Sequence, residues 1–402
     1  MRNLLLVLLV AGTAFAQIFP FTVKQSGEVI ATLEMAAPGT DWSVKGRESA
    51  MADVQVDGRP AIQVMLFAGA ESFPYRVLLG ALAAGEHKLN VSGLYAKKAT
   101  FEESSDVVVR HAPMLYERKT AIGKFTDIPL ILYCERTGNV LEYTVIFSNE
   151  DGGTSTRALM ARWGRTTDIE YVYRVTVDAA GNRVGAIIQG RGHKDLDFTG
   201  PFEGDHPLLM PVTDNNMVAG EGPSAVRYNP VPMLLDLSGA SRELAMDRNP
   251  ITWRVMSQEL VREDKLRAYG KVQGERISDL RNYIFVEAKI KNLRSRTAAL
   301  VRLKGDSRWR TANLGRFDLA IERDGWIRTT IELPPGTKAR QIGEIGFVCL
   351  AADKEKEAGV CTVDAVSKAF LLTDTYLPGA SIFEGLKPIV IPSGEIFTWT
   401  LK

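Results

Sequence analysis

Two acidic side chains, Asp168 and Glu170, lie two residues apart in the strand-like segment TTDIEYVYRV. Because successive side chains on a β-strand point to opposite faces, both acids are predicted to lie on one face, roughly 7 Å apart. Ile169, Tyr171 and Tyr173 are predicted to point to the other face, into the core. Two like charges at that spacing repel unless a cation or a hydrogen-bond donor lies between them. The pair therefore marks a candidate binding site.

Several groups could satisfy these acids. A hard divalent cation, Ca²⁺ or Mg²⁺, takes oxygen ligands, and the guanidinium of Arg162 or Arg165 binds carboxylates through forked hydrogen bonds. Asp168, Glu170 and His193 are the predicted metal ligands. The alternative is that these residues are turn formers and solvated charges, since Asp, Asn and Gly are common in turns.

Further polar groups follow in loops, and an acidic turn containing Glu150 precedes the pair. Trp163 is the nearest aromatic residue on which a sugar ring could stack. The predicted binding residues are Asp168, Glu170, His193, Asp205, His206, Asp214 and Trp163.

The familiar enzyme signatures HExxH, GxSxG and CxxC are absent from the sequence, as is the phosphate-binding GxxxxGK motif. No catalytic residue is therefore assigned. A carboxylate pair with an assisting His193 or His206 would suit general acid and base work on a glycan.

The first residues, MRNLLLVLLVAGTAFA, have the pattern of a secretory signal peptide. One basic residue precedes an apolar run that is too short to span a bilayer, and Ala14-Phe15-Ala16 fits a signal-peptidase site. We expect residues 1–16 to be removed and the mature chain to be secreted, periplasmic or extracellular. No later segment is long and apolar enough for a transmembrane helix.

The charge balance and the cysteines agree with an exported globular protein. Lys plus Arg total 49 and Asp plus Glu total 48, which gives no attraction to nucleic acid. Cys349 and Cys361 flank a charged loop and are predicted to form a disulfide in an oxidising compartment, while Cys134 is left as a buried thiol.

A period of two dominates the chain and predicts a mainly β, multi-domain protein built from β-sandwiches. An immunoglobulin-like sandwich is predicted for residues 17–108, a central sandwich with the candidate site for 109–260, and a jelly-roll-like sandwich for 267–402. Residues 190–232 are predicted to be a long ordered loop, and a helix is predicted around Trp253–Leu266.

Two local patterns in these sandwiches are specific enough to test. Asp57-Gly58 predicts a hairpin turn. Residues 284–291 alternate apolar and charged residues, which predicts a strand with one solvated face that carries Glu287.

Four short motifs between residues 110 and 220 resemble a known family. They are His111–Tyr116 (HAPMLY), Asp127–Leu130 (DIPL), Leu141–Phe147 (LEYTVIF) and Gly164–Glu170 (GRTTDIE). This order is similar to that of the secreted necrosis- and ethylene-inducing peptide-like proteins and of the related vacuolar-sorting-associated domain.

The resemblance implies a divalent cation held by acidic residues and His, and binding to the sugars of sphingolipid head groups. Asp168 and Glu170 match the acidic positions of that family. The two His positions of the family motif are occupied here by Arg165 and Thr167, and the aromatic position between the acids by Ile169.

Three functions fit the sequence. The first is a secreted protein that binds an extracellular carbohydrate or glycolipid head group with the help of a cation. The second is a glycan-acting hydrolase that uses the carboxylate pair. The third is a non-catalytic structural or adhesion protein of the cell surface, in which Arg162 and Arg165 pair with the two acids on an exposed face.

Overall fold

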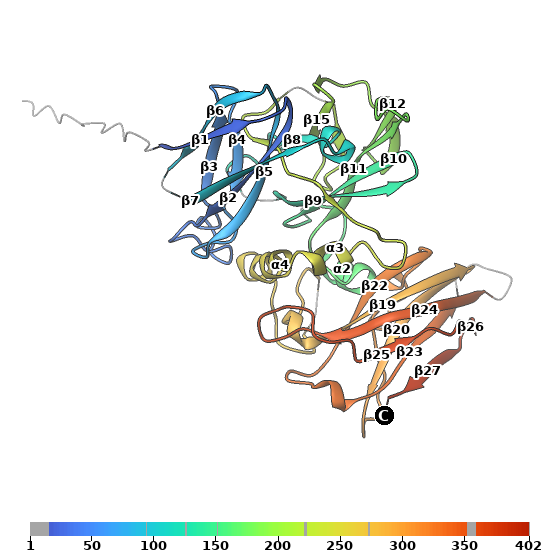
Figure 1. Ribbon diagram of the computed structural model, residues 1–402. Coiled ribbons are helices and arrows are strands. Elements are labelled where there is room, and N and C mark those ends of the chain that lie inside the picture. The colour runs from blue at the N-terminus through green and yellow to red at the C-terminus, as the bar shows by residue number, and fades with distance from the viewer. Residues whose placement is uncertain are drawn as a thin grey trace, which may run out of the picture.

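The computed structural model is built mainly from antiparallel β-sheets, which confirms the predicted mainly β, multi-sandwich fold class (Figure 1). The structure describes residues 16–93, 95–124, 127–150, 152–220, 223–271, 274–351 and 359–401. The predicted signal peptide lies outside these residues except for Ala16, which begins the first strand. None of the helices in the described ranges is long and apolar enough to cross a membrane.

The N-terminal strands form two packed sheets. One sheet has the order β1 (Ala16–Val23), β6 (Gly85–Ser92), β3 (Met51–Val56) and β4 (Ile62–Met65). The other has the order β5 (Phe73–Leu82), β2 (Gly27–Met35) and β7 (Ala96–Ser104).

The predicted hairpin turn joins β3 to β4. Asp57 and Gly58 both have positive φ values, 47° and 75°, as a type I′ turn requires. The Asp57 carboxylate also accepts a hydrogen bond from the Lys88 backbone N–H at 2.9 Å, so the turn is tied to β6.

The central region contains a larger sheet and a smaller one. The larger sheet has the order β13 (Lys194–Asp197), β12 (Arg183–Gly190), β11 (Ile169–Val177), β10 (Val140–Phe147), β9 (Pro129–Thr137) and β18 (Met233–Leu234). The smaller has the order β14 (Phe202–Glu203), β15 (His206–Pro211), β8 (Met114–Tyr116) and β17 (Arg227–Tyr228), with β16 (Val218–Ala219) paired to β15. The segment 190–232 therefore contains short strands, and its prediction as a single long loop was wrong.

Strand β11 departs from regular alternation. Tyr143 of β10 pairs with Tyr173 and Thr144 pairs with Tyr171, so Val172 is an extra residue that forms a β-bulge. Ile169 and Tyr173 consequently belong to different hydrophobic clusters. The expectation that they share one face was wrong because the bulge breaks the period of two.

The C-terminal region is a second pair of sheets. The first has the order β22 (Gly325–Glu332), β19 (Tyr283–Leu293), β24 (Val360–Leu371) and β25 (Phe383–Gly385), with β26 (Ile389–Pro392) paired to β24. The second has the order β21 (Arg310–Thr311), β20 (Ser295–Leu303), β23 (Ile342–Ala351) and β27 (Ile396–Thr400).

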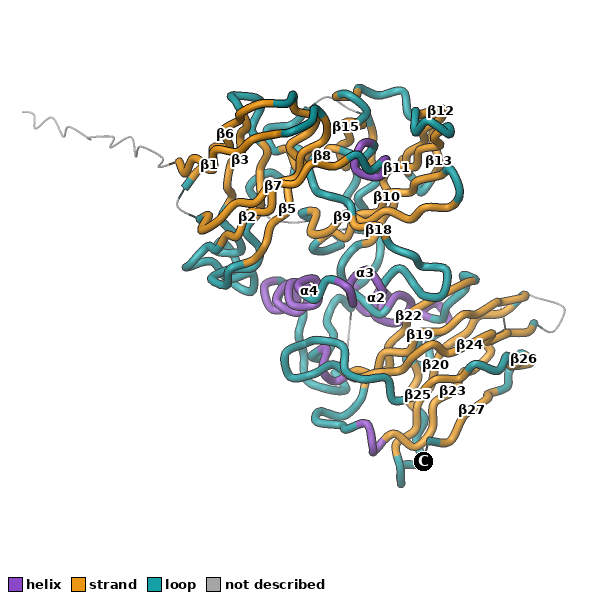
Figure 2. The backbone as a smooth tube through the Cα atoms, viewed as in Figure 1, coloured by secondary structure: helices purple, strands orange, loops and turns teal. Residues whose placement is uncertain are grey.

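The molecule has two lobes, one with the N-terminal and central sheets and one with the C-terminal sheets (Figure 2). The helices are α1 (Val107–Arg110), α2 (Thr156–Trp163), α3 (Leu244–Arg248) and α4 (Ile251–Arg262), with 3₁₀ turns η1 (Leu280–Asn282), η2 (Phe317–Leu319) and η3 (Ala339–Gln341). Helices α2, α3 and α4 lie between the two lobes. The predicted helix around Trp253–Leu266 corresponds to α4, which begins and ends slightly earlier.

Helices α3 and α4 cover the outer face of β19. Phe285 of β19 packs against Trp253 of α4 with a ring-centroid distance of 5.4 Å. Glu287, which was predicted to face solvent, is buried and paired with Arg328 at 2.7 Å. The predicted half-solvated strand was wrong here, because α3 and α4 pack on the face that the alternation assigned to water.

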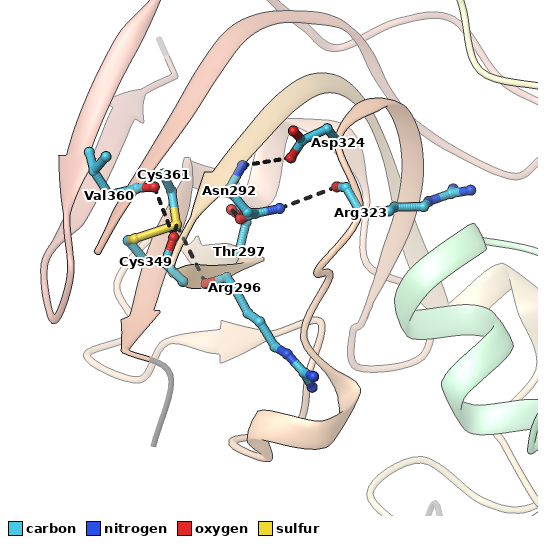
Figure 3. The surroundings of a disulfide bond; sticks show 9 residues. Asn292, Arg296, Thr297, Arg323, Asp324, Cys349, Val360 and Cys361 are labelled. Carbon is cyan, nitrogen blue, oxygen red and sulfur yellow. Dashed lines mark hydrogen bonds between the residues drawn. A yellow bond between two sulfur atoms is a disulfide. The ribbon is translucent and has the colours of Figure 1, made fainter. Parts of the chain in front are cut away.

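Cys349 of β23 and Cys361 of β24 form the predicted disulfide, with their Cα atoms 5.5 Å apart (Figure 3). The bond links the two C-terminal sheets. Within the described chain Cys134 is the free cysteine, and it is buried.

Candidate functional site

A cavity of about 180 Å³ lies at the seam between the central sheets and the C-terminal sandwich. Asp168 and Glu170 line it from the start of β11, and Glu150 lines it from the segment after β10. The remaining lining residues are Thr154, Leu159, Trp163, Arg165, Ile169, His193, Asn215, Arg242, Glu243 and Arg323.

The two predicted acids do lie in one cavity, and each has a hydrogen-bond donor. The Asn216 side-chain amide donates to Asp168 Oδ2 at 3.0 Å. The Gln189 amide donates to Glu170 Oε2 at 2.8 Å. Asp168 is almost fully buried, so its charge interacts with its neighbours through little water.

Burial raises the pKa values of the acids in this cavity. The pKa of Glu170 rises to about 8, first through burial and then through the nearby charge of Asp168. The pKa of Glu150 rises to about 7 for the same two reasons. Burial also raises the pKa of Asp168. At neutral pH the cavity therefore holds protonated carboxyl groups, which can donate hydrogen bonds as well as accept them.

Helix α2 delivers Arg165 into this cavity. The helix ends at Gly164, which has a φ of 63° and would place a Cβ only 2.9 Å from the Arg328 side chain. Arg165 then turns inward, where its Nε donates to Glu243 Oε1 at 3.1 Å and its Nη1 lies 3.9 Å from Asp168 Oδ1.

Glu243, at the start of α3, is the one cavity acid with a lowered pKa. Burial alone would raise its pKa, but the charges of Arg165, Arg323 and Arg328 outweigh this and keep the carboxylate ionised. The cavity thus has an acidic side with raised pKa values and a basic side built around Glu243.

Trp163 and His193 lie at the cavity as predicted from the sequence. The Arg323 guanidinium lies 5.4 Å from the Trp163 ring centroid, so one side of this ring is partly occupied. His193 is more than half exposed, and its Nδ1 and Nε2 lie 2.7 Å from Gln189 Nε2 and 3.0 Å from Asn215 Nδ2.

The other predicted site residues lie outside the cavity lining. The Asp205 carboxylate pairs with Arg110 Nε at 2.5 Å. His206 is buried between Glu28, at 3.2 Å, and the Ala112 carbonyl, at 2.8 Å, so it joins β15 to the N-terminal sandwich.

Asp214 is exposed and pairs with Arg118, next to the cavity residue Asn215. Arg162 also stays outside, because its guanidinium donates to the Asp318 carbonyl. Of the two arginines predicted to neutralise the acids, Arg165 is the one that lies beside them, and it does so in a buried site rather than on an exposed face.

Three charged lining residues were not predicted from the sequence: Arg242, Glu243 and Arg323. They come from more than 70 residues along the chain after Glu170, and Arg323 belongs to the C-terminal sandwich. Their local sequence offers no signal for this role, since only the packing of the two lobes brings them to the acids.

Binding of a divalent cation by Asp168, Glu170 and His193 stays a prediction. Among the described residues, no three His, Cys, Asp or Glu side chains converge closely enough to hold a metal ion. The Arg165 guanidinium lies beside Asp168, where the resemblance places a His-bound cation.

Comparisons with known proteins establish no family for this chain. No protein-family model matches it, and no curated protein is significantly similar. Among solved structures, a ruminal GH26 endo-β-1,4-mannanase matches with 16% identity and a TM-score of 0.18, covering 31% of this chain and 27% of that one. The GH2 β-galacturonidase from Eisenbergiella tayi bound to galacturonate matches with 7% identity and a TM-score of 0.17, covering 95% of this chain. The present chain spans only 36% of that galacturonidase, and TM-scores this low establish neither a shared fold nor a shared function.

Proposed function

We propose that the protein is exported and binds a carbohydrate in the cavity between its central and C-terminal sandwiches. The observation that carries this proposal is the lining itself: carboxyl groups, guanidinium groups and amides converge beside the indole of Trp163. Sugar binding needs polar groups and an aromatic surface. The hydroxyls of a sugar donate and accept hydrogen bonds, and the faces of its ring pack on aromatic side chains.

The size of the cavity suits one small unit of a glycan. Pockets for drug-sized ligands measure roughly 300–1,000 Å³, whereas this cavity measures about 180 Å³. It therefore favours a single sugar ring or the end of a chain over a long oligosaccharide bound along its length.

Isothermal titration of the mature protein with a panel of monosaccharides tests the proposal. We expect at least one sugar to bind and the Glu170→Ala variant to bind it at least tenfold more weakly, because Glu170 is mostly protonated at neutral pH and Ala, unlike Gln, removes its hydrogen bonds to the sugar hydroxyls. Arg76→Gln is the matched control, since Arg76 pairs with Glu102 on the surface of the N-terminal sandwich. The proposal is wrong if no sugar binds or if both variants bind like the unchanged protein.

Glycan hydrolysis is the second candidate, and the raised pKa values of Glu150 and Glu170 favour it. A carboxyl group that stays protonated near pH 7 can act as the general acid that glycoside hydrolysis requires. Asp168 would be the partner carboxylate, and His193 is the one predicted assisting His that reaches the cavity. Release of reducing ends from an oligosaccharide library, lost in Glu150→Gln, would establish this activity.

The proposal has two further parts: that a Ca²⁺ or Mg²⁺ ion binds at the site, and that the chain is exported. A thermal-shift titration with each cation tests the first, because a ligand that binds only the folded protein raises its melting temperature. Sequencing the N-terminus of the mature protein tests the second, with Gln17 as the expected first residue.

A further inference from the structure

The basic side of the cavity holds two guanidinium groups, those of Arg242 and Arg323, that make no short ion pair within the described chain. Resting on the proposed carbohydrate function, we propose that the ligand is an acidic saccharide whose anionic group binds between Arg242 and Arg323. The acid can be the carboxylate of a uronic acid or a phosphate or sulfate ester, since each offers oxygen acceptors to a guanidinium.

Three guanidinium groups reach the cavity from separate parts of the chain. Arg165 follows α2, Arg242 precedes α3, and Arg323 precedes β22 of the C-terminal sandwich. Arg165 is paired with Glu243, whereas the Arg242 guanidinium makes no hydrogen bond or short ion pair within the described ranges. Arg242 is half-buried, and the charges of Glu170, Glu142 and Glu243 act on it only from longer range, so its guanidinium is free to bind an oxyanion that enters the cavity.

Arg323 also makes no short ion pair within the described chain. Its Nε is shielded from solvent and lacks a hydrogen-bond partner within the described chain, and its Nη2 makes only a long contact, 3.5 Å, to the Arg162 carbonyl. Burial and the neighbouring charges of Arg165 and Arg242 lower its pKa to about 10, while Glu243 opposes this shift. The group nevertheless stays charged at physiological pH.

The backbone of Arg323 is firmly held although its guanidinium is not. The Asn292 side-chain amide donates to the Arg323 carbonyl at 3.2 Å, and the Asn292 backbone N–H donates to Asp324 Oδ1 at 2.8 Å. Figure 3 shows the Arg323 side chain extending from this anchor, away from the disulfide and toward the helix beside it. A fixed backbone with an unpaired guanidinium is the arrangement of a preorganised binding group.

Arg328 shows that packing of the two lobes does not by itself leave arginines unpaired. It lies five residues further along, is fully buried, and donates to both Asp247 and Glu287 at distances of 2.7–3.0 Å. Arg242 and Arg323 thus differ from Arg328, because neither of them makes a short ion pair within the described residues.

Isothermal titration with matched sugars tests the inference. The probes are a neutral hexose, its uronic acid and its 6-phosphate, each in the gluco, galacto and manno configurations, together with acetate and inorganic phosphate. We expect an acidic sugar to bind about tenfold or more tightly than its neutral form, and Arg242→Gln and Arg323→Gln to remove that preference. The surface variant Arg76→Gln should retain it.

The outcomes separate the two proposals. Equal binding of neutral and acidic sugars would overturn the acidic ligand and leave carbohydrate binding intact, whereas binding of none of the sugars would overturn both. Acetate or phosphate binding as tightly as the acidic sugars would also overturn the inference, because the site would then recognise the anion alone. Preference for the uronic acid or for the phosphate identifies which anion the two arginines fit.

Discussion

At the scale of single residues, the arginines between the two lobes divide into those with short ion pairs and those without, and the two classes should respond differently to mutation. Arg328→Gln leaves Glu287 and Asp247 buried without their main partner, which costs about 3–5 kcal/mol in comparable cases. Arg323 interacts with Glu243 only from longer range and leaves its Nε without a hydrogen bond in the described chain, so Arg323→Gln should change stability by no more than ~1 kcal/mol.

Denaturant unfolding of the two variants beside the unchanged protein provides the measurement. A loss of stability in Arg323→Gln as large as that in Arg328→Gln would mean that Arg323 has a structural role rather than a ligand-binding one. A neutral or stabilising effect is the usual signature of a residue retained for function at a cost in stability.

Glu170 makes the stability of the folded protein depend on pH. Its pKa is about 8 in the folded protein and near the ordinary value of 4.5 when unfolded. Between these pH values the folded state holds a proton that the unfolded state has lost, so the stabilising contribution falls as the pH rises through this window. Gln cannot ionise, and Glu170→Gln should therefore be more stable than the unchanged protein at pH 8–9, by ~1 kcal/mol or more.

Below pH 4.5 the two proteins should unfold alike, because Glu170 is then protonated in both states. Melting temperatures measured from pH 4 to 9 check this, while the other titratable groups facing Glu170, namely Asp168, Glu150 and His193, are unchanged in the variant. Parallel curves for the two proteins would contradict the raised pKa.

At the scale of secondary-structure elements, the Cys349–Cys361 disulfide joins β23 to β24 close to the strand that anchors Arg323. The Ser295 hydroxyl lies 3.3 Å from the Cys361 sulfur and donates to the Val360 carbonyl at 2.8 Å. The Asn292 side chain donates to the Arg323 carbonyl, as Figure 3 shows. Replacing both cysteines by Ser should lower stability by about 3 kcal/mol, through the loop entropy that the bond removes from the unfolded chain.

Calorimetry of the double variant and of the unchanged protein, with and without reductant, measures this contribution. Reductant should lower the melting temperature of the unchanged protein and leave that of the variant unaltered. A variant as stable as the oxidised protein would show that the bond contributes nothing to the C-terminal sandwich.

Elements with local signals could be predicted from the sequence, and elements shaped by packing could not. The Asp57-Gly58 hairpin, the disulfide and the joint placement of Asp168 and Glu170 follow from turn chemistry and alternation within a few residues. Glu287 is buried because helices from another part of the chain pack on β19, and no pattern within β19 predicts that packing.

The same distinction applies to the candidate site. The acids of the site are close together in the sequence, with Asp168 and Glu170 at one strand and Glu150 in an earlier turn. Arg242 and Arg323 reach the cavity only because distant segments pack together. Asp205 and His206 were grouped with the site because they are close to it in sequence, but Asp205 pairs with Arg110 and the His206 ring contacts Glu28 of the N-terminal sandwich. Proximity along the chain was therefore a poor guide for loop residues.

At the scale of the whole molecule, the two lobes visible in Figure 1 are joined by hydrogen bonds and by a shared hydrophobic cluster. Thr329 and Thr330 of β22 donate to the Ala161 and Met160 carbonyls at 2.6 and 2.8 Å, and so satisfy the last turn of α2. One hydrophobic cluster runs from the central sheet through α4 to Phe285 and Phe370 of the C-terminal sandwich. Separation of the lobes would expose this cluster and break open the cavity, since Arg323 comes from one lobe and Glu170 from the other.

This arrangement predicts that the lobes stay together after the chain between them is cut. A protease site inserted directly after the exposed residue Lys271 would allow cleavage into a fragment with the N-terminal and central sandwiches and a fragment with the C-terminal sandwich. We expect the cleaved protein to elute as one species in size-exclusion chromatography, because dissociation would expose Trp253, Phe285 and Phe370 to water. The Arg328→Gln variant should dissociate more readily, since it loses the ion pairs to Asp247 across the same interface. Two separate peaks for the unchanged protein would show that the lobes are independent, and a cavity that needs Arg323 beside the acids would then lack a stable basis.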